Sequence, residues 1–408
     1  MKQSKIIILL INFFLIIQSN YSQNKEILGY LPYYQFDHVD DIDFNKLSQV
    51  CIAFANPTAD TSIILENNNY DDYNDIVSML HEKNIEVFIS LAGGAVYEPE
   101  YQRWLDFTEE ENLAIFIGHI MSYCRQHELD GVDFDLEWNL IEDVGAKYEN
   151  FTLMMADSLW NSGMKILGTF PGTYRYNALS DLCLETFDQI NLMSYNLTGP
   201  WAPNNPGPHA PYSFAVQSID YWKAQNVDGN KILLGVPFYG FDFDSTPVSS
   251  FTYRSMVNQN TDYAFLDQVG QKYYNGIATI KDKTILAMDE TNGIMIWELG
   301  QDYFGEYSLL NIIYETMYTG IQVEEDKELS YIDAFPNPVK DVLNIQNNTA
   351  SKANYWLISP TAQIIQKGQI PNKSQIHIFL NHLNSGMYIL QTVFPSSGKK
   401  QILKIIKL

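Results

Sequence analysis

The feature that most constrains the fold is a regular succession of short apolar runs and longer amphipathic segments between residues 27 and 298. The runs have the length of strands, whereas the intervening segments carry apolar residues at helical spacing. Alternating strands and helices are typical of α/β folds with a parallel sheet, and eight such units predict a (β/α)8 TIM barrel. The expected strands are Ile27–Leu31, Gln49–Phe54, Val87–Leu91, Gly131–Glu137, Lys165–Phe170, Gln189–Met193, Ile232–Val236 and Gly293–Glu298.

One intervening segment, residues 109–127, shows the helical pattern clearly. Thr108 and Glu111 have the spacing of a capping box, which predicts that the helix begins at this point. The apolar residues that fall on one face of this helix are Leu113, Phe116, Ile117, Ile120, Met121 and Cys124.

The fourth expected strand carries an acidic face. Apolar and acidic residues alternate in DGVDFDLEW, residues 130–138. Successive side chains of a strand point to opposite faces, so Asp133, Asp135 and Glu137 share one face at intervals of about 6.6 Å. Like charges held in this way share protons, and sharing raises the pKa of at least one carboxyl group. A carboxyl group that stays protonated near neutral pH is what a general acid requires.

Two other interpretations of the acidic run are weaker. A solvated sheet edge rarely carries an apolar opposite face such as Val132, Phe134 and Leu136. A site for Mg²⁺ or Ca²⁺ would use carboxylates, but no second ligand cluster stands out, and the His residues lack metal-ligand spacing. We therefore expect no metal and no organic cofactor.

The acidic run also resembles the signature of a known family. Residues 130–137 match the complete pattern D-G-x-D-x-D-x-E of glycoside hydrolase family 18, the chitinases and endo-β-N-acetylglucosaminidases. Other expected strand ends resemble motifs of this family in the same order, over roughly residues 26–320. These motifs are Leu28-Gly29-Tyr30, Ala53-Phe54-Ala55, Met193-Ser194-Tyr195-Asn196 continuing to Gly199-Pro200-Trp201, Leu234–Gly240 and Met295-Ile296-Trp297-Glu298.

The chain departs from the family pattern in three places. The third-strand Ser-x-Gly-Gly is one residue longer here, in residues 90–94, SLAGG. Leu136 stands where many chitinases have Trp, and Asn196 stands where many members have Asp. The Asn removes one carboxylate near the expected acetamido group of the substrate, and we expect this to shift the pH optimum.

The resemblance implies a substrate-assisted retaining mechanism, in which the acetamido oxygen of the sugar takes the place of a protein nucleophile. In this mechanism Glu137 protonates the glycosidic oxygen, while Asp135 holds the acetamido N–H and stabilises an oxazolinium-like cation. Asp133 shares a proton with Asp135, and Tyr195 donates its hydroxyl to the acetamido oxygen. Asp130 has the opposite strand parity, so we interpret it as structural.

Aromatic residues beside the expected strand ends indicate a carbohydrate groove, because indole and phenol rings pack on sugar faces. Three other tryptophans, Trp104, Trp160 and Trp222, lie in helical patterns and are expected in the core. The expected substrate-binding residues are Trp297, Trp201, Tyr239, Trp138, Asn196 and Met193, and packing is the alternative role for Trp138.

The charge of the chain excludes some partners and indicates two units. The net charge of −24 argues against nucleic acid and against an anionic membrane surface. Residues 331–408 hold eight Lys and two Asp, a charge of +6, so residues 1–330 hold −30. This asymmetry predicts two units with different roles. We expect a monomer whose partner is a polysaccharide or glycan substrate.

Both ends of the chain carry features of export. Residues 1–22 have a basic start and an apolar run too short to span a bilayer, which predicts a signal peptide. The barrel domain is expected at residues 24–320, followed by a charged linker at residues 321–330. Residues 331–408 predict a small β-sandwich, with strand-like runs at Val342–Ile345, Tyr355–Ile358, Ile376–Phe379 and Tyr388–Val393.

The expected β-sandwich resembles the C-terminal sorting domain of type IX secretion. The resemblance rests on FPNP at residues 335–338, LNSGMY at 383–388 and KIIKL at 404–408. It implies the type IX machinery as a partner and a protein that is secreted or at the cell surface. A carbohydrate-binding module is the alternative, but the tail shows no exposed aromatic row.

The leading hypothesis is a secreted glycosidase that cleaves β-1,4-linked N-acetylglucosamine polymers, namely chitin and chito-oligosaccharides. One alternative keeps the chemistry and changes the substrate: an endo-β-N-acetylglucosaminidase that cuts the chitobiose core of N-glycans. A non-catalytic glycan-binding protein is an alternative of another class. It would lack the acid at Glu137 or the hydroxyl of Tyr195, and both are present. A structural adhesin based on the tail is weaker still.

Overall fold

The computed structural model divides the chain into two compact units, residues 1–319 and 320–408. It describes residues 25–65, 70–318, 331–349, 351–359, 364–384, 386–394 and 400–407. The expected signal peptide and the expected linker therefore lie outside the described residues. Among the residues that are described, no helix combines the length and the apolar character that crossing a bilayer requires.

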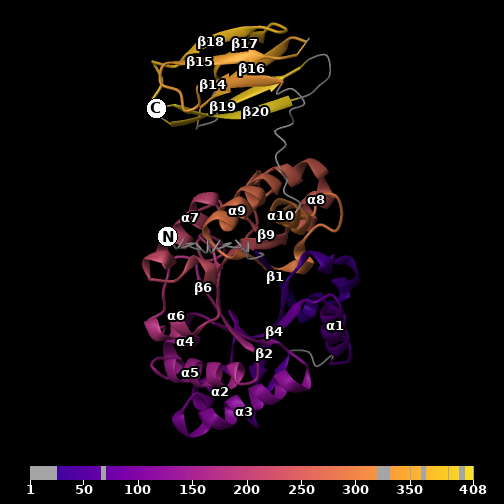
Figure 1. Ribbon diagram of the computed structural model, residues 1–408, viewed down its shortest axis with the longest axis vertical. Helices are drawn as coiled ribbons and strands as arrows, with labels where there is room; N and C mark the ends of the chain where they lie inside the picture. Colours follow the sequence, from indigo (N-terminus) through magenta and orange to yellow (C-terminus); the bar gives the residue numbers. More distant parts are fainter. Residues whose placement is uncertain are drawn as a thin grey trace, which may run out of the picture. The chain divides into compact units, whose positions relative to one another are not determined.

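In the described part of the first unit, eight parallel strands close into a barrel, as the sequence predicts (Figure 1). The order is β1-β13-β8-β7-β6-β5-β4-β2, and pairing of β1 with both β13 and β2 closes the ring. The short strand β3 (Ile63–Leu65) pairs antiparallel with β2. The barrel strands are β1 (Glu26–Pro32), β2 (Gln49–Pro57), β4 (Glu86–Gly93), β5 (Gly131–Leu136), β6 (Lys165–Pro171), β7 (Gln189–Met193), β8 (Ile232–Pro237) and β13 (Gly293–Trp297).

Helices cover the outside of the barrel, and Figure 1 shows α2, α3 and α5 outside the ring of strands. Apolar side chains of the strands and the helices meet in one large core between the two layers. The helices are α1 (Tyr70–Glu82), α2 (Glu100–Phe107), α3 (Glu110–Gln126), α4 (Trp138–Val144), α5 (Lys147–Trp160), α6 (Asp181–Thr186), α7 (Tyr212–Ala224), α8 (Tyr253–Gln259), α9 (Ile277–Glu290) and α10 (Leu309–Tyr318).

Strand β5 shows how the alternating sequence divides between the two faces. Val132, Phe134 and Leu136 are fully buried in the core between strands and helices. Phe134 stacks on Phe151 of α5 with ring centroids 4.6 Å apart. Burial of a side chain of this size stabilises the fold by roughly 1.5–3 kcal/mol. Asp133, on the other face, bonds to side chains from strands across the barrel interior.

Two local predictions are wrong. Helix α3 begins at Glu110 without a side-chain cap, because the Thr108 hydroxyl donates to the carbonyl of Trp104 at 2.8 Å and ends α2 instead. The capping box is therefore absent. Trp160 is 50% exposed at the end of α5, where its indole N–H donates to Asp188 at 3.0 Å. Trp104 and Trp222 are fully buried, as predicted.

A small antiparallel sheet follows β8 and lies at one side of the barrel mouth. Its strands are short, and β9 pairs with both β10 and β12. Tyr239, one of the predicted substrate-binding residues, begins β9. The strands are β9 (Tyr239–Asp242), β10 (Ser249–Thr252), β11 (Gln268–Val269) and β12 (Lys272–Tyr273).

The described residues of the second unit form two antiparallel sheets around an apolar core of their own. One sheet has the order β14-β15-β18, and the other has the order β17-β16-β19-β20. Along β15 buried and half-buried residues alternate, which is the pattern expected of a strand with one face in the core. The strands are β14 (Ile332–Phe335), β15 (Val342–Asn347), β16 (Ala353–Ile358), β17 (Ile364–Ile370), β18 (Gln375–Phe379), β19 (Gly386–Val393) and β20 (Lys400–Lys407).

Candidate active site

A cleft of about 760 Å³ opens at the carboxyl ends of the barrel strands, where TIM-barrel proteins place their active sites. All the predicted site residues except Asp133 line this cleft, and Asp133 is fully buried beneath it on β5. The sequence analysis did not identify seven further lining residues as site residues. The predicted residues in the lining are Asp135, Glu137, Trp138, Met193, Tyr195, Asn196, Trp201, Tyr239 and Trp297; the others are Tyr30, Tyr34, Phe54, Ala92, Gly94, Ala95 and Thr169.

Asp133 accepts hydrogen bonds on both of its carboxylate oxygens. The hydroxyls of Tyr30 and Ser90 donate to Oδ2 at 2.7 and 2.6 Å. The hydroxyl of Thr169 and the amide of Asn191 donate to Oδ1 at 2.8 and 3.4 Å. Burial raises the pKa of Asp133, and these donors from four other strands oppose the rise because they stabilise the charged form.

Asp135 and Glu137 are in a different position. Asp135 is 3% exposed, and its Oδ1 has no hydrogen-bond partner among the described residues. Burial raises the pKa of Asp135 well above its usual range, and the charges of Glu137 and Asp133 add to that rise. Burial also raises the pKa of Glu137 to about 7. The distribution of donors therefore favours a charged Asp133 beneath two carboxyl groups that hold protons readily.

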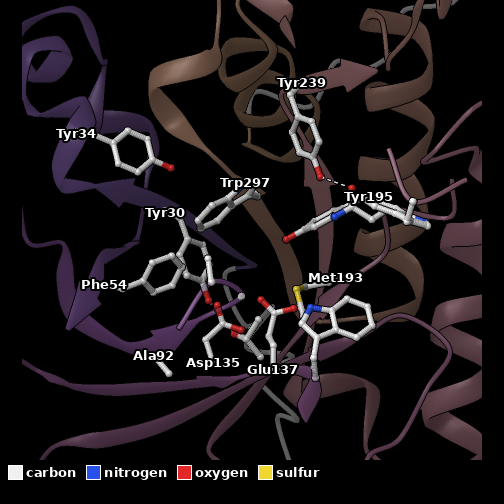
Figure 2. Close-up of a pocket in the computed structure, with 16 residues that line it drawn as sticks. Tyr30, Tyr34, Phe54, Ala92, Asp135, Glu137, Met193, Tyr195, Tyr239 and Trp297 are labelled. Carbon is white, nitrogen blue, oxygen red and sulfur yellow. Dashed lines mark hydrogen bonds between the residues drawn. The ribbon is translucent and has the colours of Figure 1, made fainter. Parts of the chain in front are cut away.

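Trp297, at the end of β13, forms an aromatic floor for the cleft. Its ring stacks on Phe54 with centroids 5.6 Å apart and packs against Tyr30 at 5.3 Å. Figure 2 shows Trp297 beside Tyr30, with the carboxyl groups of Asp135 and Glu137 below it in this view. The floor is rigid because aromatic rings from β1 and β2 support the indole from behind.

Tyr195 and Tyr239 form one wall of the cleft, with their rings edge to face at 6.2 Å. The Tyr239 hydroxyl donates to Oδ1 of Asn196 at 2.6 Å, the bond that is dashed in Figure 2. This bond occupies the amide oxygen of Asn196 and leaves its NH2 group as a donor for the cleft. The Tyr195 hydroxyl contacts the sulfur of Met295 at 3.9 Å, a weak acceptor, and can turn to a stronger one.

Two exposed tryptophans flank the cleft. Trp138 is 60% exposed and Trp201 is 59% exposed. Trp138 has a φ of +53°, a left-handed conformation that is strained for a bulky residue, and its backbone N–H donates to the Tyr176 hydroxyl at 3.0 Å. The strain is located where the chain turns an indole toward a binding cleft. Trp201 packs edge-on against Phe241 at 5.7 Å.

The lengthened end of β4 lies directly beside the expected acid. Ala92 and Gly93 both have left-handed backbone conformations, with φ of +76° and +83°. This turn places Gly94 against the carboxylate of Glu137, so close that a Cβ atom at residue 94 would come within 2.6 Å of it. Ser90 points into the barrel toward Asp133, so the extra residue changes the end of β4 and not its interior.

Most of the first unit matches one known family. Residues 20–302 match the model for glycosyl hydrolases family 18. The chain belongs to glycoside hydrolase family 18. A family 18 chitinase from the chitin utilization locus of Flavobacterium johnsoniae is 36% identical, with a TM-score of 0.70 over 73% of this chain and 95% of that one. The first unit is thus a chitinase-like hydrolase domain of family 18.

More distant relatives carry less weight. A chitinase structure from Bacteroides thetaiotaomicron is 23% identical, with a TM-score of 0.63 over 73% of this chain and 98% of that one, and shows the fold alone. An endochitinase of Manduca sexta is 22% identical over 50% of this chain and 42% of its own length. A chitinase-like effector of Moniliophthora roreri is 23% identical over 50% of this chain. The chain spans about half the length of these curated relatives, 54% for the effector and 42% for the endochitinase.

The second unit of this family 18 chain has a match of its own. Residues 333–407 match the model for a secretion system C-terminal sorting domain. The tail is thus a sorting domain of the type IX kind, which the sequence predicted, and it implies secretion or location at the cell surface.

Asp130 has a structural role at the start of β5, at the opposite end of this strand from Glu137. Asp130 accepts hydrogen bonds from the backbone N–H of Val87 at 2.7 Å and from His81 at 3.0 Å, so it ties the start of β5 to β4, as its strand parity indicated. Across the described ranges, no group of three or more His, Cys, Asp or Glu side chains is placed to hold a metal ion.

Sequence reasoning missed the residues that support Asp133. The available signal was a polar residue inside an otherwise apolar strand, since such a residue needs a buried partner. Ser90, Thr169 and Asn191 each stand in such a strand and are each at most 2% exposed.

Proposed function

We propose that this chain is a chitinase that cleaves β-1,4-linked N-acetylglucosamine chains with retention of configuration. The observation that carries the proposal is the carboxyl group of Glu137, whose pKa burial raises to about 7 in a cleft that it shares with Asp135 and Trp297. At neutral pH a large fraction of this carboxyl group is protonated, as a general acid requires. The similarity to a chitinase at 36% identity supports the same substrate class.

In the first step, Glu137 donates its proton to the glycosidic oxygen, and the bond between this oxygen and C1 breaks. The acetamido carbonyl oxygen of the same sugar attacks C1 and forms an oxazolinium ion, so the protein supplies no nucleophile. Trp297 supports the apolar face of the reacting sugar. The hydroxyl of Tyr195 and the free NH2 of Asn196 are donors for the acetamido oxygen and hold it in position for attack.

Asp135 stabilises the positive charge that develops on the acetamido group. For this purpose it must be ionised, so its proton moves to Asp133 as the acetamido N–H approaches. The Tyr30 and Ser90 hydroxyls that donate to Asp133 can rotate and accept that proton's hydrogen bond, because a hydroxyl is both donor and acceptor. The proton is thus shared by Asp133 and Asp135 throughout the cycle.

In the second step, the Glu137 carboxylate accepts a proton from water, and the resulting hydroxide adds to C1 from the side that the leaving group vacated. The oxazoline ring opens and the acetamido group is restored. Two inversions at C1 give net retention, with the product released as the β-anomer. Glu137 is protonated again and ready for the next turnover.

The activity is tested with the full-length protein and two substrates offered separately, chitopentaose and a high-mannose glycoprotein, with products identified by mass spectrometry. Glu137→Gln is the paired variant, since the amide keeps the shape and cannot donate the acid proton. We expect chitopentaose to be cut by the wild type, and the variant to lose at least about 10²-fold in kcat.

Other outcomes have definite meanings. Release of glycans from the glycoprotein without cleavage of chitopentaose assigns the chain to the endo-β-N-acetylglucosaminidases. Binding of chitopentaose without cleavage makes it a glycan-binding protein. Undiminished cleavage by Glu137→Gln contradicts the assignment of the acid.

A further inference from the structure

A buried polar cluster packs against Tyr239 and the loop that follows β7, and the mechanism above does not use it. Lys283 of α9 is fully buried, and its ammonium group donates to the carbonyl of Ala210 at 2.7 Å. The same nitrogen donates to Oδ1 of Asn275 at 2.8 Å, while the Asn275 amide donates to the Ala210 carbonyl at 2.9 Å. Two side chains thus converge on one carbonyl group.

The neighbouring residue in the chain, His209, is also fully buried. Its Nε2 lies 3.1 Å from the carbonyl oxygen of Tyr239, so Nε2 carries the proton and donates it. Burial and the charge of Lys283 lower the pKa of His209 to about 3, so the ring is neutral. The carbonyl of His209 accepts from the N–H of Leu197 at 2.9 Å, which closes the loop on itself.

The loop held in this way, residues 197–211, is the later part of the connection from β7 to α7 and carries Trp201. The Trp201 ring lies over Gly199, where a Cβ atom would come within 2.7 Å of it, and packs edge-on against Phe241. Phe241 in turn contacts the ring of His209 at 5.0 Å. His209, Phe241 and Trp201 therefore form a continuous series of edge-to-face ring contacts from the buried cluster to the exposed indole.

Burying a lysine costs free energy because its charged group loses its hydration. Burial lowers the pKa of Lys283 to about 7, although the nearby Asp267 opposes the fall. An apolar side chain of the same length would fill the position without desolvating a charge. The observed geometry supplies the reason for a lysine, because only a donor can hold the Ala210 carbonyl.

We propose that Lys283 and His209 are positioning residues that fix the 197–211 loop against β9 and hold Trp201 and Asn196 ready for an N-acetylglucosamine unit of the substrate chain. The inference rests on the proposed chitinase function for the identity of the sugar. Because Trp201 contacts bound sugar in the ground state and the transition state alike, its displacement raises KM with little change in kcat.

The test is Lys283→Met in the full-length protein, with Met chosen because its unbranched side chain occupies a similar space. We expect KM for chitopentaose to rise about fivefold or more, with kcat within about twofold of the wild type. The fluorescence emission of Trp201 is obtained by subtracting the spectrum of the Trp201→Phe variant, once in the wild-type background and once in the Lys283→Met background. In the Lys283→Met background we expect this emission to move to longer wavelength and to be quenched more strongly by acrylamide. This second readout needs no substrate.

Thr284→Val is the matched control. Thr284 is the next residue of α9 and is also fully buried, but its hydroxyl donates within the helix to the carbonyl of Ile280. The substitution perturbs the same helix without loosening the loop, so KM and Trp201 emission stay at the wild-type values. If Lys283→Met does not fold, Asn275→Ala replaces it, because it removes the other donor to Ala210.

A double-mutant cycle separates positioning from general damage. In a Trp201→Phe background, Lys283→Met adds little to KM if the lysine acts through the indole. An equal rise of KM in both backgrounds, or unchanged Trp201 emission, overturns the inference. Failure of the wild type to cut chitopentaose contradicts the proposed function instead. In that case the Trp201 emission still decides whether Lys283 holds the loop.

Discussion

Gly94 lies directly against the acid Glu137: a Cβ atom at residue 94 would be 2.6 Å from Oε1 of that carboxylate. Such a distance is below any van der Waals contact, so even the smallest side chain at residue 94 must push the carboxyl group aside. The extra residue at the end of β4 and the position of the acid are therefore linked features of this chain.

Gly94→Ala is expected to lower kcat on chitopentaose by at least about tenfold, because a misplaced acid loses transition-state stabilisation. The melting temperature should change little, since residue 94 is exposed. Gly118→Ala in α3 is the control, because a Cβ atom there meets nothing within 4 Å. Full activity of Gly94→Ala would show that the carboxyl group of Glu137 is not held where the structure places it.

The pH profile of kcat/KM should follow the protonation of Glu137. Burial raises its pKa to about 7, and the acid must be protonated to act, so kcat/KM falls above about pH 7. Asn196→Asp adds a negative charge to the same cleft and disfavours the charged form of Glu137. The descending limb of the pH profile therefore moves to higher pH. Initial rates between pH 4 and 9 measure both effects, and a limb that stays in place in Asn196→Asp contradicts the assignment.

The stability of the barrel should respond to the same group. Glu137 has an unfolded pKa near 4.3 and a folded pKa of about 7, so the folded state binds more protons between these values and stability falls as pH rises through them. Glu137→Gln removes the free-energy cost of ionising this buried carboxyl group in the folded state. We expect it to raise the melting temperature of the barrel by roughly 2–6 °C at pH 8 and hardly at all at pH 4. If the melting temperatures of variant and wild type differ by the same amount at both pH values, the pKa of Glu137 is not raised in the folded state. Glu111→Gln serves as the control, because Glu111 is exposed.

Tyr30→Phe tests the support of Asp133. The substitution removes a buried donor that lies 2.7 Å from Oδ2 and leaves the charged group short of a partner. Loss of such a bond costs about 1.5–3 kcal/mol of unfolding free energy, and kcat should fall as well because the Asp133–Asp135 pair is disturbed. Tyr101→Phe is the matched control, since its hydroxyl donates to Asp143 at 2.6 Å on the exposed surface, where the cost stays below about 1 kcal/mol. Equal losses in the two variants would refute the special role of Tyr30.

The barrel and the acidic strand could be predicted because both depend on local periodicity. The alternation of Val132, Phe134 and Leu136 with the carboxylates fixes which side chains enter the barrel, and the structure confirms that division. A chain-local rule failed at Thr108. The spacing of Thr108 to Glu111 fits a capping box, but the Thr108 hydroxyl donates to a carbonyl of the preceding helix α2. This can be recognised only when the boundaries of both helices are known.

The rest of the site depends on contacts between distant segments, which periodicity does not encode. The sequence shows Gly94 as part of the third-strand motif, but it does not show that this residue lies against the carboxylate of Glu137. From the sequence, Lys283 cannot be distinguished from a surface lysine of a helix. Its contact becomes visible only when α9 is packed against the loop that holds Ala210. Both become functional candidates only through the arrangement of loops around the barrel mouth.

The most direct measurement of the central claim is proton NMR of chitopentaose during the first minutes of hydrolysis by the full-length protein. Attack by the sugar's own acetamido group predicts that the β-anomer of the new reducing end forms first and that the α-anomer follows only as mutarotation proceeds. Initial release of the α-anomer, or equally fast cleavage of an oligosaccharide without acetamido groups, would contradict the mechanism.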